Sequence, residues 1–106
     1  MATDWAADVK KYAPHADDAV IASMVKTYRL VLSKADSALV SFSDPSELHT
    51  VRENFLKKKL GLTLSDEELD TAIAEVGKTM KDGTRNTRLS VYYLLAEKFG
   101  KLDAFR

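Results

Sequence analysis

Three segments of this chain carry both a start signal and a stop signal for a helix, and these signals constrain the fold more than any other feature. The paired signals are residues 44–47 (DPSE) with Gly61, residues 65–68 (SDEE) with Gly83, and Thr87 with Gly100. A capping side chain accepts hydrogen bonds from the free N–H groups of the first turn, and glycine adopts the left-handed turn after the last. The signals predict helices and say little about activity.

The spacing of apolar residues extends this prediction to five helices, at residues 4–13, 16–32, 45–60, 66–81 and 87–99. The last differs from the others because apolar residues from Leu89 to Phe99 cover most of its circumference. Such a helix must be covered by several neighbours. We therefore predict an all-α fold, a compact bundle of about five helices with the C-terminal helix at its centre.

Two features of the predicted bundle are less regular. Residues 33–43 read as a loop with a single 3₁₀ or helical turn that places Leu39 and Phe42 in the core. A short strand is the alternative, although no partner strand is visible. Gly77 lies inside the fourth helix, where glycine costs about 1 kcal/mol relative to alanine. We expect another backbone to approach it closely there, and the fifth helix is the candidate.

Composition narrows the class of protein. The length of 106 residues predicts a single domain over residues 1–106. Lys plus Arg and Asp plus Glu number 16 each, a balance that argues against general nucleic-acid binding without excluding a local basic patch. The chain has no cysteine, which excludes disulfides, thiolate metal sites and a cysteine nucleophile. No secretory signal or run of about 20 apolar residues is visible, so we expect a cytoplasmic protein with no membrane segment.

Two groups of side chains are candidates for a metal site. His49 and Glu53 stand four residues apart on one predicted helix, but no H-E-x-x-H pattern supplies further ligands. The acidic residues of 66–70 follow a cap and lack the calcium-loop pattern, so their expected role is to complement the helix dipole. We predict no metal and no cofactor, and no catalytic motif is present, which makes an enzyme the minority interpretation.

Two sets of residues are candidates for contact with a partner. The basic set consists of Lys57, Lys58, Lys59, Arg85 and Arg88. It could bind an anion if the ends of the third and fifth helices pack together, although a solvated surface is the default interpretation. The aromatic set, Trp5 and Tyr92, could contact a second copy of the chain. For Trp5 the commoner role is to seal the bundle.

Residues 8–14 (DVKKYAP), 51–62 (VRENFLKKKLGL) and 92–102 (YYLLAEKFGKL) resemble a family of small, mainly proteobacterial proteins that is known only as a domain of unknown function. The resemblance covers nearly the whole chain. It implies a compact, stand-alone helical domain in a cytoplasmic protein. It implies no activity, cofactor or active-site residues.

These observations leave three hypotheses of function. The first is a small helical module that binds another protein or itself, without catalytic activity. The second is a nucleic-acid or anion binder that uses Lys57, Lys58, Arg85 and Arg88. The third is an enzyme or small-ligand protein with a pocket beside the fifth helix.

Overall fold

The computed structural model describes residues 5–34, 39, 40, 42, 44–80 and 87–105. Its helical elements are α1 (Trp5–Tyr12), α2 (Asp18–Thr27), α3 (Arg29–Leu32), α5 (Pro45–Thr50), η1 (Val51–Lys59), α6 (Asp66–Thr79), α7 (Arg88–Lys98) and η2 (Leu102–Phe105). Element η1 is a π-helix and η2 is a 3₁₀ helix. Within these described ranges the β-structure is limited to one isolated bridge, so the predicted all-α class is confirmed.

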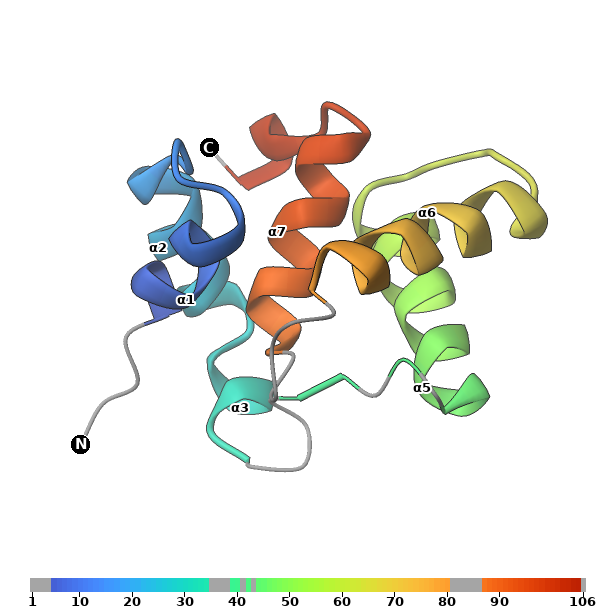
Figure 1. Ribbon diagram of the computed structural model, residues 1–106, viewed down its shortest axis with the longest axis horizontal. Coiled ribbons are helices and arrows are strands. Elements are labelled where there is room, and N and C mark those ends of the chain that lie inside the picture. The colour runs from blue at the N-terminus through green and yellow to red at the C-terminus, as the bar shows by residue number, and fades with distance from the viewer. Residues whose placement is uncertain (1–4, 35–38, 41, 43, 81–86, 106) are drawn as a thin grey trace.

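Helix α7 stands at the centre of the molecule. In Figure 1 it lies between α1 and α2 on one side and α6 on the other, and it contacts all three as well as η2. Every residue from Arg88 to Ala96 is buried, whichever face of the helix it occupies. The prediction of a central C-terminal helix is therefore confirmed. None of the described helices has the length and apolar content needed to cross a bilayer.

The capping signals act where the sequence places them. Asp44 accepts a hydrogen bond from the Ser46 N–H at 2.9 Å, at the start of α5. Ser65 and Thr87 cap α6 and α7 in the same way. Gly61 and Gly100 have φ values of 67° and 66°, in the region that glycine adopts without strain. The third stop signal, Gly83, lies outside the described residues.

The predicted second helix is shorter at its start and is divided near its end. Asp17 is the N-cap of α2 and accepts from the Ala19 N–H at 2.9 Å, so residue 16 lies before the helix. Tyr28 separates α2 from α3. The Tyr28 ring packs against the core, which fixes the chain at this break.

The predicted third helix changes character halfway along. After α5 the backbone takes up π-helical bonding, and the Leu60 N–H donates to the Phe55 carbonyl at 2.9 Å. The wider turn lets both Phe55 and Leu56 point into the core. Two adjacent side chains of an α-helix point about 100° apart, so the α-helical period alone does not predict that both are buried. π-helical turns are rare and often occur near functional sites.

Between Lys34 and Asp44 the structure describes Leu39, Val40 and Phe42. Leu39 forms an antiparallel bridge with Thr87, which is the partner that the sequence did not reveal. Phe42 packs against the core as predicted, whereas Leu39 is half-buried and Val40 is the most buried of the three. The turn predicted for this segment falls largely on residues outside the described ranges.

Gly77 provides the close approach that its position in α6 indicates, but the partner is a ring and not a backbone. A Cβ atom at residue 77 would lie 3.0 Å from the Cδ1 atom of Phe42. The prediction of a nearby backbone from the fifth helix is corrected accordingly. The absence of a side chain at Gly77 leaves room for the ring of Phe42, which belongs to the segment between α3 and α5.

Gly77→Ala and Phe42→Ala test this contact together. In the wild-type background, the gain of about 1 kcal/mol in helix propensity is offset by the clash with the ring, so stability should change little or fall. In the Phe42→Ala background the same change should stabilise by about 1 kcal/mol. Chemical denaturation of the four proteins measures the difference. Equal effects in both backgrounds would show that the ring does not constrain residue 77.

Candidate functional site

A carboxylate from α1 meets the start of α7. Thr87 Oγ1 donates a hydrogen bond to Asp8 at 2.6 Å, and Ser90 Oγ donates to the same carboxylate oxygen. The negative charge lies at the helix N-terminus, where the backbone dipole favours it. These contacts fix α1 against the central helix, so the cluster has a structural role.

Arg88 is the first residue of α7, and its side chain lies inside the molecule. The residue is 6% exposed, and its guanidinium forms an ion pair with Glu47 of α5. Arg88 Nη1 also donates to the Tyr92 hydroxyl at 3.1 Å. A cation at a helix N-terminus opposes the helix dipole. The carboxylate of Glu47 offsets this unfavourable placement and joins α5 to α7.

The environment shifts the pKa of both partners on α7. Burial raises the pKa of Tyr92, and the neighbouring Arg88 only partly opposes this. For Arg88 burial acts to lower the pKa, but the contacts with Tyr92 and Glu47 outweigh it and the pKa rises. The arginine therefore stays charged and the tyrosine stays neutral, which is the pairing that the hydrogen bond requires.

An aromatic cluster continues from Tyr92 into the core. The Tyr92 ring stacks on Phe55 of η1, with centroids 3.9 Å apart and planes inclined by 10°. Tyr28 meets Tyr92 edge-on at 5.0 Å, and Phe105 lies 6.2 Å from Phe55. Burial raises the pKa of Tyr28 as well. These four rings join the α2–α3 junction, η1, α7 and η2.

A second charged cluster joins η1 to α6, and we call it the Arg52 network. Arg52 Nε binds Glu53 at 2.8 Å, and Nη1 binds both oxygens of Asp70 at 3.0 Å. Lys57 completes it through ion pairs of 2.8 Å with Glu53 and 2.5 Å with Asp66. Two cations thus face three carboxylates. The network carries a net negative charge at the start of α6.

His49 contributes to this network through one ring nitrogen. Its Nδ1 atom lies 3.0 Å from Arg52 Nη2. An arginine can only donate, so Nδ1 must accept and the proton of the neutral ring is on Nε2. His49 and Glu53, which were weighed as a metal pair, are therefore both engaged by Arg52. Among the described residues, no three His, Asp or Glu side chains are placed so that they could hold a metal ion together.

A groove of about 340 Å³ lies beside this network, and we call it the α5–α6 groove. It is lined by Pro45, Leu48, His49, Arg52, Asp70 and Ile73. Its lining combines apolar side chains with one ion pair, Arg52 to Asp70. An open groove of this kind can receive an apolar side chain whose neighbours carry positive charge.

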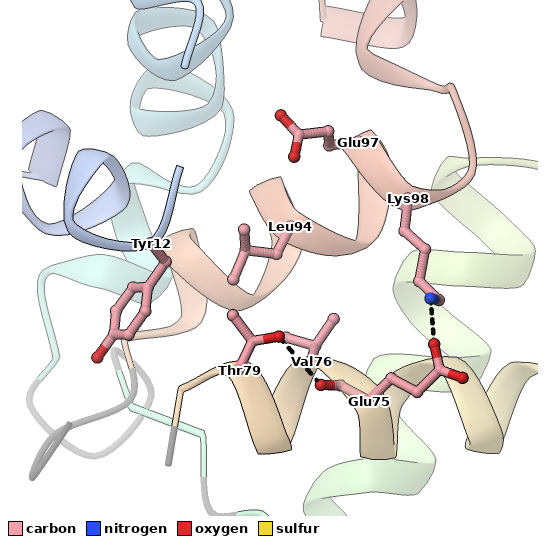
Figure 2. Close-up of a pocket in the computed structure, with 7 residues that line it drawn as sticks. All are labelled: Tyr12, Glu75, Val76, Thr79, Leu94, Glu97 and Lys98. Atoms are coloured by element: carbon pink, nitrogen blue, oxygen red, sulfur yellow. Dashed lines mark hydrogen bonds and ion pairs between the residues drawn. The ribbon is translucent and has the colours of Figure 1, made fainter. Parts of the chain in front are cut away.

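A second, smaller groove of about 280 Å³ lies where the ends of α1, α6 and α7 meet. Figure 2 shows Tyr12 at one side, Leu94 and Val76 in the middle, and the Lys98–Glu75 ion pair at the other side. This groove is beside the fifth predicted helix, where the third hypothesis placed a pocket. Polar atoms make up more of its lining than in the α5–α6 groove.

The predicted basic residues do not point to one place. Lys57 faces the carboxylates of α6 and Arg88 faces the interior. Lys59 lies over the Phe105 ring at 5.1 Å, and Lys58 is exposed. Arg85 lies outside the described residues. Of the four members that the structure describes, Lys58 and Lys59 are the exposed cations.

The predicted aromatic contact residues also have separate positions. Trp5 is the first residue of α1, but its side chain is outside the described part of the structure. Tyr92 is buried within a single chain, where it stacks on Phe55. The adjacent Tyr93 is buried too, and its hydroxyl accepts from the Asp17 N–H at 2.9 Å. Neither tyrosine ring is presented to solvent.

Sequence reasoning missed the carboxylate partners of Arg88 and the whole Arg52 network. A usable signal existed for the first, because an arginine at the start of an apolar helix needs a nearby negative charge. A signal also existed within η1, where Glu53 precedes Lys57 by four residues in the favourable order. The approach of α6 to η1 has no local sequence signal.

The fold and these sites define a small all-α protein held together by a central helix and two ionic clusters. The chain belongs to the family described as "Protein of unknown function (DUF2853)", whose model matches residues 4–103. The resemblance seen in the sequence is thereby confirmed as family membership. Comparison with curated proteins gives no match.

Arg88→Met tests the buried ion pair. Removing one partner of a buried pair leaves the other charge uncompensated, so we expect a loss of about 3 kcal/mol in the free energy of unfolding. Arg29→Met is the matched control, because Arg29 is exposed and should cost less than about 0.5 kcal/mol. Urea denaturation followed by circular dichroism measures both. Equal losses for the two variants would contradict the interior placement of Arg88.

Glu53→Gln tests the Arg52 network through its pH dependence. Hydrogen bonds from Arg52 and Lys57 lower the pKa of Glu53 to about 2. A lowered pKa means that the ionised form stabilises the fold at neutral pH and that this contribution is lost as the pH falls towards 2. Between about pH 5 and pH 2, the urea midpoint of the wild type should therefore fall more steeply than that of the variant. Parallel curves would rule out the network as a source of stability.

Proposed function

We propose that this protein is a non-catalytic interaction module that binds another protein, or a second copy of itself, through the α5–α6 groove. The observation that carries the proposal is the groove itself. Pro45 and Leu48 supply apolar surface over the buried Ile73, and the Arg52–Asp70 pair lies beside them. Binding of an amphipathic segment in an apolar groove is a recurring mode of protein recognition.

The charges around the groove favour a basic partner. The Arg52 network has one more carboxylate than it has cations, and Glu67 is exposed one helical turn before Asp70. Opposite charges across an interface speed encounter and fix its register. We therefore expect the bound segment to carry an apolar side chain flanked by lysine or arginine.

The nucleic-acid or anion hypothesis has less support from the contacts. Two of its four residues, Lys57 and Arg88, are committed to carboxylates within the chain. The small-ligand hypothesis placed its pocket beside the fifth helix, where the groove of about 280 Å³ is smaller than the usual volume for such sites. The α5–α6 groove, at about 340 Å³, is near the lower end of that range. The charged, open rim fits a peptide better than an enclosed ligand.

Fluorescent peptides test the proposed groove. A helical peptide with one leucine between lysines should bind with a Kd of about 10–100 μM, and leucine-to-serine replacement should weaken it about tenfold or more. A version with glutamate in place of lysine should bind less tightly. Fluorescence anisotropy measures each affinity.

Two variants locate the binding. His49→Trp fills the α5–α6 groove and should abolish binding of the basic peptide. Asn54→Trp adds the same ring at an exposed position of η1 that does not line the groove, and should leave the affinity unchanged. Binding that survives His49→Trp would place the interaction elsewhere and overturn the proposal.

A further inference from the structure

One leucine in the described structure is far more exposed than any other large apolar side chain. Leu30, in α3, is 81% exposed, whereas Leu64 is 41% exposed. A lone exposed leucine on a protein surface needs no special explanation. Leu30 is of interest because of the charged residues around it and because a groove of the molecule could receive its side chain.

Unpaired cations surround Leu30. All three lie within four residues of Leu30 along the chain: Lys26 near the end of α2, Arg29 next to it in α3, and Lys34 just after α3. All three are exposed, and none forms an ion pair with a described residue. We call Lys26, Arg29, Leu30 and Lys34 the Leu30 knob. It is an apolar side chain with basic flanks.

The α5–α6 groove offers the complementary surface. Its apolar lining can cover a leucine side chain, and Asp70 lies in its wall. Asp66 and Glu67 precede Asp70 by four and three residues on α6, and therefore share its face of the helix. All three carboxylates belong to exposed residues. The charge around the groove is thus opposite to that of the Leu30 knob.

The knob and the groove lie on different sides of the molecule. Figure 1 shows α3 on the side of α1 and α2, and shows α5 and α6 on the other side of α7. A single chain therefore cannot place its own knob in its own groove. A second copy can place its knob in the groove of the first copy, and the groove of the second copy then stays free.

We propose that two copies of this chain associate head to tail, with Leu30 of one copy inserted in the α5–α6 groove of the next. This inference rests on the proposed function, because it assigns an occupant to the same groove. Lys26, Arg29 and Lys34 then face Asp66, Glu67 and Asp70. An interface between two different surfaces is heterologous, so it continues into a ring or an open chain of copies.

Sedimentation velocity over a range of protein concentrations tests the association. The wild type should associate at high concentration, and Leu30→Glu should weaken the association about tenfold or more. Leu64→Glu is the matched control, because it replaces the other exposed leucine outside the knob and should associate as the wild type does. Raising the salt from about 0.1 M to about 1 M shortens the screening length from ~10 Å to ~3 Å and should weaken the association further.

A mixing experiment tests the head-to-tail geometry. Leu30→Glu lacks the knob but keeps the groove, and His49→Trp fills the groove but keeps the knob. Each variant alone should be monomeric, whereas an equal mixture should form a dimer that goes no further. Association of His49→Trp by itself would overturn the proposed groove contact, and so would a mixture that stays monomeric while the wild type associates.

The outcomes separate this inference from the proposed function. If the wild-type chain stays monomeric but binds the basic peptide in its groove, the proposed interaction module stands and the head-to-tail association is overturned. A monomeric chain that also fails to bind the peptide would overturn both. Circular dichroism of every variant confirms that the helices are retained.

Discussion

A helix whose side chains are buried on every face needs neighbours on every face, and α7 imposes this requirement on the whole molecule. Its residues from Arg88 to Ala96 are buried, with α1, α2, α6 and η2 packed against it and side chains of α5 and η1 in contact with Arg88 and Tyr92. Removing apolar area from water stabilises by about 25 cal/mol per Å². The surrounding helices therefore bury apolar area by packing towards α7 as well as against one another.

The polar contacts follow from that arrangement. Wherever a neighbour meets the start of α7, a charged or hydroxyl group has to be satisfied away from water. Asp8 does this for Thr87 and Ser90, and Glu47 does it for Arg88. The ionisable groups of this region hold α1 and α5 in place. The surfaces that we propose for contact with a partner, on α3 and between α5 and α6, lie away from this region.

The sequence contains most of the fold but little of the candidate site. Caps at Asp44, Ser65 and Thr87 are local signals, and the apolar circumference of α7 is a property of one helix, so both were predictable. The π-helical bonding of η1 was not, because it depends on two adjacent side chains, Phe55 and Leu56, that both pack inward. The pairing of Glu47 with Arg88 joins residues 41 positions apart. The α5–α6 groove likewise exists only once η1 and α6 pack together.

The three lysines that end η1 illustrate how a uniform run of sequence acquires distinct chemical environments. Lys57 neutralises carboxylates of its own chain, Lys59 covers an aromatic ring, and Lys58 is solvated. A modification that removes one positive charge would therefore have a different effect at each position. At residue 57 it would expose unbalanced acids beside α6, at residue 59 it would remove an attraction to Phe105, and at residue 58 it would alter hydration alone.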